Sequence, residues 1–208
     1  MKRLFIFLTC SIAILALIIG VVAWLSLQPL PWHDPPDYSD TEITSLADLA
    51  ERRMNEEFHK IRPTDEVWHL RITADAVNAW LSGRLEGWLT HDQQLKMPEE
   101  VHGPQIHITN EGIWLAANIE IDGATPRPLA VELWIWIEDG VMYVEPISVR
   151  LGRIPVPLTF FESVMTELRE NVRGVEAVVP LMDDREVHIL GIELEESAFV
   201  LTCQTHLP

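Results

Sequence analysis

The first apolar stretch constrains the chain most. Residues 4–27 carry no charge and include only three hydroxyl side chains among 24 residues. A helix of that length rises by about 36 Å, more than the roughly 30 Å hydrocarbon core of a bilayer. Since a helix satisfies its own backbone hydrogen bonds in lipid, the stretch predicts one transmembrane helix. Lys2 and Arg3 precede it, and the positive-inside rule therefore places the N-terminus in the cytoplasm and the rest of the chain outside.

A cleaved signal peptide is the alternative interpretation of this stretch. The tripeptide at residues 21–23, Val-Val-Ala, is a passable cleavage site. Secretory apolar cores run about 7–15 residues, however, and the longer stretch here favours an anchor that remains attached. The expected organisation is a cytoplasmic stub and anchor at 1–27, a linker at 28–39 and an extracytoplasmic domain at 40–208. Four prolines in the linker predict an extended spacer.

The net charge of the domain limits the classes of partner that it can attract. Only two of the 15 basic residues precede residue 28, so the remainder holds 13 basic and 32 acidic residues, a formal net charge of −19. This charge repels the phosphates of nucleic acids and anionic headgroups, which excludes nucleic acid as a partner attracted by charge. A basic protein partner or divalent cations remain compatible with it.

Apolar residues at helical spacing predict three amphipathic helices in the domain. The first covers about 40–59, and the second follows a capping Thr73 and extends to about residue 89. The third begins at the capping box Thr159-x-x-Glu162 and extends to about residue 172. Asn78 lies off the apolar stripe of the second helix, and we expect its amide to bond a neighbouring loop or strand end.

Alternation of apolar and polar residues predicts the strands. Asp139-Gly140 is a strong two-residue hairpin signal, and Pro146 in the return strand indicates an edge position or a bulge. The expected strands are 67–72, 105–109, 113–121, 129–138, 141–150, 185–194 and 198–205. The order of elements is typical of an α+β fold. We expect a curved antiparallel sheet, built as a meander, packed with about three amphipathic helices and preceded by the transmembrane helix.

Two segments of the chain carry a family resemblance. Residues 72–81 read Ile-Thr-Ala-Asp-Ala-Val-Asn-Ala-Trp-Leu, and residues 147–158 include Gly152-Arg153-Ile154 followed by Pro155. They resemble the Asp/Glu-x-x-Asn-x-x-Leu-like helix and the Gly-Lys-Leu-x-x-Pro segment of the YpmS family of bacterial membrane-anchored proteins. Arg153 and Ile154 occupy the positions of Lys and Leu in the family's segment, and Pro155 is a proline that the family pattern lacks. The resemblance covers most of residues 65–208 and implies a sheet wrapped around helices, similar to elongated lipid-carrying domains, but implies no activity.

The sequence contains no recognised catalytic motif. The sequence has no nucleophile elbow, zinc-protease motif, phosphate-binding loop, dinucleotide fingerprint or Cys-x-x-Cys. His102 and His107 form the closest histidine pair, but their spacing matches no known metal site. Cys203 is expected to be a small buried side chain of a strand. The sequence therefore predicts no catalytic residue, no metal site and no cofactor.

Tryptophans supply the candidate ligand-binding residues. The strand at 129–138 is apolar on both faces, because Trp134 and Trp136 alternate with aliphatic side chains, and Trp114 lies on the preceding strand. A half-exposed strand does not normally present two indoles to water, so something is expected to cover them. One of the helices, an apolar ligand and a protein partner are the alternatives. If a ligand does so, Trp114, Trp134 and Trp136 line its groove.

Two functional hypotheses follow from these features. The first is a membrane-tethered extracytoplasmic binding module for a lipid or other hydrophobic ligand. The alternative is an interaction or scaffolding domain of a membrane-envelope complex that binds no small ligand. No set of candidate catalytic residues in the sequence supports an enzymatic function.

Overall fold

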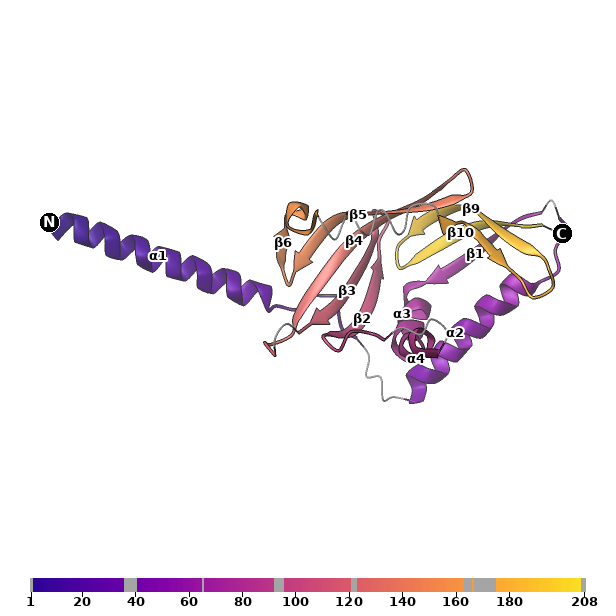
Figure 1. Ribbon diagram of the computed structural model, residues 1–208, viewed down its shortest axis with the longest axis horizontal. Helices are drawn as coiled ribbons and strands as arrows, with labels where there is room; N and C mark the ends of the chain where they lie inside the picture. Colours follow the sequence, from indigo (N-terminus) through magenta and orange to yellow (C-terminus); the bar gives the residue numbers. More distant parts are fainter. Residues whose placement is uncertain are drawn as a thin grey trace.

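The computed structural model describes residues 2–35, 41–64, 66–91, 96–120, 123–162, 166 and 175–206. A long helix, α1 (Lys2–Ser26), projects from one end of a folded domain (Figure 1). The side chains of α1 are described from residue 12 onward. Within the described part of the chain, no helix is long and apolar enough to cross a membrane.

The domain contains two antiparallel sheets, and the α+β prediction is confirmed in this respect. The first sheet has the strand order β1-β10-β9-β8. Its members are β1 (Val67–Thr73), β8 (Val178–Pro180), β9 (Glu186–Glu195) and β10 (Ala198–His206). The strand nearest the C-terminus thus pairs with the first strand of the domain, and this long-range pairing separates it from the meander.

The second sheet is the predicted meander, with the order β2-β3-β4-β5-β6 and with β7 beside β5. Its members are β2 (Val101–Ile108), β3 (Ile113–Ile119), β4 (Arg127–Glu138), β5 (Val141–Leu151), β6 (Ile154–Val156) and β7 (Val175–Glu176). The expectation of a single curved sheet is wrong, because there are two sheets and neither is strongly curled (Figure 1).

The β4–β5 hairpin forms as the sequence predicts. Asp139 and Gly140 have φ angles of 52° and 75°, the left-handed conformation that a tight two-residue hairpin requires. Pro146 lies at a register shift, where Glu132 pairs with Ser148 and the next residue of β4 pairs with Pro146. The proline therefore marks a bulge, one of the two positions predicted for it.

The helices differ from the prediction in one respect. Helix α2 (Thr41–His59) has the predicted extent, but the second predicted helix is divided into α3 (Ala74–Gly83) and α4 (Leu85–His91). Thr73 caps α3 as expected, with its Oγ1 accepting a 3.2 Å bond from the amide of Ala76. A Cβ at Gly83 would lie 2.9 Å from the Cβ of Ala47, so Gly83 permits α2 and α3 to cross closely.

The third predicted helix lies mostly outside the described residues. The structure describes a short 3-10 helix, η1 (Leu158–Phe161), at its start and two further residues, 162 and 166. Residues 163–165 and 167–174 carry the rest of the prediction and are not described.

The main core lies between α2 and one face of the first sheet. Its buried members are Phe58, Trp68, Leu70, Leu181, Val187, Leu201 and Cys203. Trp68 donates a 3.2 Å hydrogen bond to Thr205 Oγ1, so its indole nitrogen is satisfied inside the core. Arg185 is buried and donates to the backbone oxygens of His59 and Lys60 at 3.0 and 3.1 Å. The guanidinium thus supplies hydrogen-bond donors to carbonyl groups at the C-terminal end of α2, and its positive charge interacts favourably with the helix dipole.

A second core joins the two sheets. Ala74, Ile108 and Ile113 are buried there, and Ile135 of β4 and Phe199 of β10 pack against them. The aliphatic face of β4 therefore points toward α3 and the first sheet. Asn78 of α3 completes the junction by exchanging hydrogen bonds of 3.0 and 2.7 Å with the backbone of Ile106. Asn78 thus bonds neighbouring backbone as expected, but its partner lies within the edge strand β2 and not in a loop or at a strand end.

Candidate functional site

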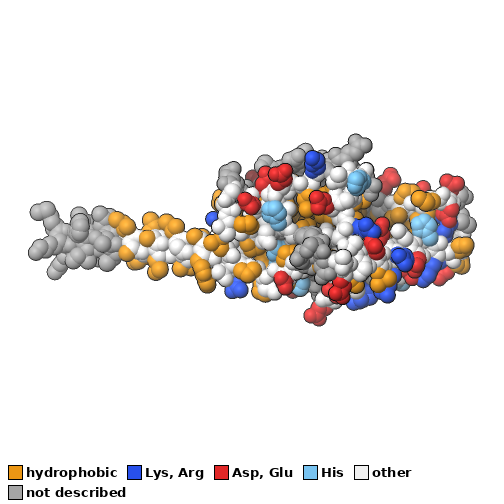
Figure 2. Space-filling model, turned by 90° about the horizontal axis from the view of Figure 1, so that it is seen from below, with side chains coloured by type: hydrophobic (Ala, Val, Ile, Leu, Met, Phe, Trp, Pro, Cys, Tyr) orange, Lys and Arg blue, Asp and Glu red, His pale blue; other side chains and the backbone are white. Residues whose placement is uncertain are grey.

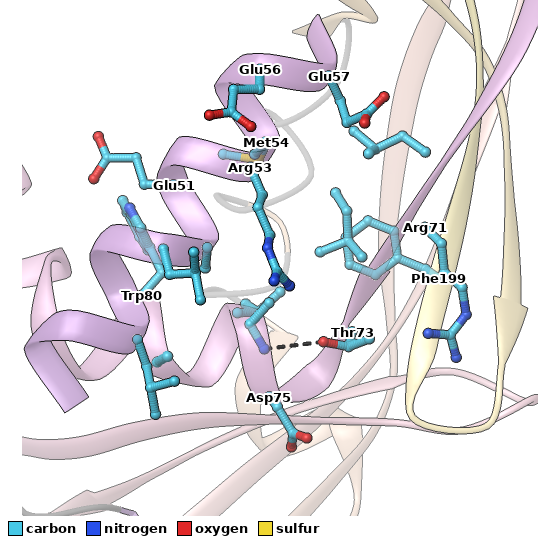
Figure 3. Close-up of a pocket in the computed structure, with 18 of the residues that line it drawn as sticks. Glu51, Arg53, Met54, Glu56, Glu57, Arg71, Thr73, Asp75, Trp80 and Phe199 are labelled. Atoms are coloured by element: carbon cyan, nitrogen blue, oxygen red, sulfur yellow. Dashed lines mark hydrogen bonds between the residues drawn. The ribbon is translucent and has the colours of Figure 1, made fainter. Parts of the chain in front are cut away.

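A groove of about 920 Å³ lies between α2, α3 and the β1–β10 edge of the first sheet (Figure 3). Helix α2 packs on the core of the first sheet through Met54 and Phe58 toward its C-terminal end, and it contacts α3 through Ala47 near Gly83. Between these two contacts the helix bridges an open space. The stretch of α2 from Leu46 to Glu57 that lines the groove is roughly 16 Å long at the rise of an α-helix.

The walls of the groove are mainly apolar. They are lined by Leu46, Leu49, Ala50, Met54, Leu70, Ile72, Ala76, Val77, Ala79, Trp80 and Phe199. Two of these side chains are well exposed, Leu46 at 48% and Leu49 at 41%. Exposed leucines beside an apolar hollow form a surface that gains free energy when an apolar group covers it.

Six charged side chains border the groove; among the described residues Glu51, Glu57 and Arg71 form ion pairs, whereas Arg53, Glu56 and Asp75 form none. Glu57 pairs with Lys60 and lies 2.9 Å from the guanidinium of Arg62. The hydrogen bond from Lys60, with the charge of Arg62 in support, lowers the pKa of Glu57. Arg71 lies 2.9 Å from Glu195, so its charge is neutralised on the outer side of the sheet.

Arg53 is the exception among these cations. Its side chain reaches from α2 into the groove toward Thr73, between Trp80 and Phe199 (Figure 3). Across the described ranges of the chain, Arg53 forms no ion pair and no hydrogen bond. An unneutralised guanidinium therefore faces an apolar hollow.

The predicted tryptophan site lies elsewhere, on the outer face of the second sheet. Trp114 packs beside a small core of Leu30, Ala116 and Ala130, and the guanidinium of Arg150 lies 4.8 Å from the centre of its ring. Leu30 belongs to the linker, so the cover over this part of the sheet comes from the linker. Among the described residues, the linker is the element that packs on this part of the tryptophan face. Residues 163–165 and 167–174 of the third predicted helix are not described, and a helical cover over the rest of the face stays a prediction.

The linker is consequently not a free spacer over its described part. The Trp32 ring stacks on the His107 ring with centroids 5.1 Å apart, and His33 Nε2 lies 3.0 Å from the carbonyl of Gly103. His33 is itself buried. Burial lowers the pKa of His107, which favours the neutral ring in this stack. Residues 28–35 thus form an ordered strap across the second sheet, a packing that linker composition alone does not reveal.

The other two predicted tryptophans are not covered in this way. Trp134 is 43% exposed, and Trp136 stacks on Tyr143 with ring centroids 5.1 Å apart. None of Trp114, Trp134 and Trp136 lines the groove. Trp80 lines it instead, and its place on the apolar stripe of a helix next to a strand was the only signal in the sequence.

The end of α1 docks on the segment that carries the second family motif. The amide of Arg153 donates a 3.1 Å hydrogen bond to the carbonyl of Leu25. Gly152 has a φ of +57°, and a Cβ built on it would lie 2.5 Å from the carbonyl oxygens of Leu25 and Ser26. Glycine is therefore required there by both its backbone conformation and the close approach of the helix.

The histidines and the cysteine of the described domain form no reactive cluster. His102 and His107 do not come together, since His102 lies 4.0 Å from Glu120 and His107 stacks on the linker. A pair missed in the sequence, His188 and His206, has ring centroids 4.3 Å apart across neighbouring strands. No group of three metal-ligating side chains occurs among the described residues. Cys203 is buried as expected, and burial raises the pKa of its thiol to about 11.

Fold and site together define a class: an α+β domain with a charged-rim apolar groove, carried at the end of a long helix. No family model and no curated protein matches the chain.

Proposed function

We propose that this chain is a membrane-tethered extracytoplasmic binding module that holds a lipid or other hydrophobic molecule in the groove between α2, α3 and β1. The observation that supports this proposal is the groove itself. Its volume of about 920 Å³ lies within the range of roughly 300–1,000 Å³ that is usual for small-molecule sites. Its elongated apolar walls suit an alkyl chain, and the exposed Leu46 and Leu49 are side chains that such a chain would cover.

The tether is supported by the N-terminal segment. Residues 4–27 are uncharged, and α1 extends away from the domain (Figure 2). Its described apolar side chains are exposed around the helix, from Ile12 at 59% to Trp24 at 59%. A helix that is apolar on all sides needs an apolar surrounding, which a bilayer provides. An N-terminus in the cytoplasm and YpmS-like family membership are part of the same proposal.

A groove-blocking variant tests the proposed function. Ala50 lines the groove, and Ala50→Trp fills part of the hollow, whereas Asn55→Trp places the same side chain on an exposed position of α2 outside the groove. Full-length protein is purified from cells and examined by native mass spectrometry and solvent extraction. Wild type and Asn55→Trp should retain a lipid-sized mass that Ala50→Trp lacks at an unchanged melting temperature. A wild-type protein that carries no such mass and acquires none from added lipids would contradict the proposal.

The exposed indole of the second sheet supports a second candidate, an interaction domain of a membrane-envelope complex. Trp134 at 43% exposure, with the Trp136–Tyr143 stack on the same hairpin, forms an aromatic surface on β4 and β5. Aromatic side chains of this kind are enriched in protein interfaces. Loss of a co-purifying protein from Trp134→Ala, with the groove still occupied, would favour this role in addition to the first.

A further inference from the structure

We infer that the molecule held in the groove is an amphiphile with an anionic head group, a carboxylate or a phosphate, and that Arg53 binds this group. The inference rests on the proposed function and specifies the ligand. The groove provides apolar walls for a chain and, among the described residues, one unneutralised cation for a head group.

The position of Arg53 on α2 makes its lack of a partner informative. Glu56 and Glu57 follow it by three and four residues, the spacing at which helical ion pairs form. Arg53 pairs with neither, because its side chain turns into the groove (Figure 3). Glu57 is already engaged by Lys60 and Arg62. The geometry therefore leaves the guanidinium available to a ligand.

The other charges near the groove do not replace this role. Arg71 is neutralised by Glu195, and Asp75 points away from the guanidinium of Arg53 (Figure 3). Glu51 lies 3.6 Å from Arg84. Glu56 also lines the groove without an ion pair, but it lies on the first turn after Arg53 and does not contact the guanidinium through any ion pair or hydrogen bond among the described residues. Acidic residues farther away are screened by physiological salt over a length of about 8 Å, so the group that touches Arg53 directly is expected to be anionic.

An anionic head group also fits the chemistry of the side chain. A guanidinium presents a planar fork of donors that matches a carboxylate or a phosphate through two parallel hydrogen bonds. An alkyl chain attached to that group can lie against the half-buried Trp80 and the exposed Leu46 and Leu49. Apolar surface over the Arg53 guanidinium and the anionic head group strengthens the attraction between them, because it lowers the effective dielectric constant.

Three probes with one alkyl chain test the inference: dodecanoate, dodecanol and dodecyltrimethylammonium, which carry negative, neutral and positive head groups. Full-length protein in phosphatidylcholine nanodiscs is titrated with each, and native mass spectrometry counts bound probe. The variants are Arg53→Gln, Arg53→Lys and the neighbouring Arg52→Gln, which is exposed and does not line the groove. Dodecanoate should bind most tightly, Arg53→Gln should weaken it about tenfold without affecting dodecanol, and Arg53→Lys should restore part of the affinity.

The outcomes separate this inference from the proposed function. Equal binding of dodecanoate and dodecanol, or an equal loss of both in Arg53→Gln, would overturn the anionic head group and leave an apolar groove. Tighter binding of the ammonium probe would reverse the assigned sign. If none of the probes binds and Ala50→Trp behaves as wild type, the proposed function fails together with the inference.

Discussion

Substitution of Gly152 should detach the end of α1 from the domain. The residue has a φ of +57°, and non-glycine residues in this region cost about 1–2 kcal/mol. A Cβ would also lie 2.5 Å from the carbonyl oxygens of Leu25 and Ser26, which must then move by about 1 Å to reach ordinary contact. That movement breaks the hydrogen bond from Arg153 to Leu25, worth about 0.5–1.5 kcal/mol. The expected cost of Gly152→Ala is therefore about 1.5–3.5 kcal/mol.

Gly140 provides the matched control. It has a similar φ of +75°, but nothing lies within 4 Å of the Cβ that a substitution would add. Gly140→Ala should therefore show the backbone cost alone, about 1–2 kcal/mol. Gly152→Asn is a second probe, because asparagine tolerates the left-handed region yet still brings a Cβ against the helix end.

Hydrogen exchange at the amide of Arg153 gives the decisive measurement, alongside the free energy of unfolding in urea. In Gly152→Ala and Gly152→Asn this amide should exchange faster than in wild type, since it loses its acceptor at Leu25. It should keep its protection in Gly140→Ala. Unchanged protection in both Gly152 variants would refute the docking of α1 on this turn.

Three further outcomes test packing and charge. Asn78→Ala should lower the free energy of unfolding by about 1–3 kcal/mol in urea titrations, because both backbone bonds to Ile106 are lost; a neutral result would contradict the docking role. Cys203, whose thiol pKa burial raises to about 11, should react with a thiol reagent at pH 8 only once urea unfolds the domain, as followed by peptide mass spectrometry. Glu57 has a pKa that Lys60 lowers from 4.5, so its stabilising effect is present above pH 4.5 and lost as pH falls through the lowered value. The drop in melting temperature caused by Glu57→Gln should accordingly shrink on acidification; a constant drop would contradict the ion pair.

Local signals in the sequence predicted the elements that depend on a few neighbouring residues. Thr73 caps its helix, and Asp139-Gly140 forms the turn. Period-two alternation located β4 and the two final strands. These features arise from backbone preferences and side-chain direction within one segment, which a sequence displays directly.

Long-range packing accounts for what the sequence did not predict. The pairing of β1 with β10 joins residues more than a hundred positions apart and produces two sheets in place of one. The strap over the second sheet depends on Leu30 meeting Ala116 and Ala130, small side chains that leave room for it. Nothing in the linker's own residues specifies such a partner, so its prolines indicated only an extended chain.

The groove was missed for the same reason, and its location bears on how the proposed module would work. Its walls combine α2, β1, α3 and β10, which come together because β1, the first strand of the domain, pairs with β10, the last. Figure 1 places the first sheet and α2 in the half of the domain remote from α1. If α1 spans the bilayer, the second sheet, fixed to α1 through Gly152 and through the strap, stands between the membrane and the groove. A ligand in the groove is then held away from the bilayer surface in a defined orientation, which suits transfer to or from a partner outside the membrane better than binding within the headgroup layer.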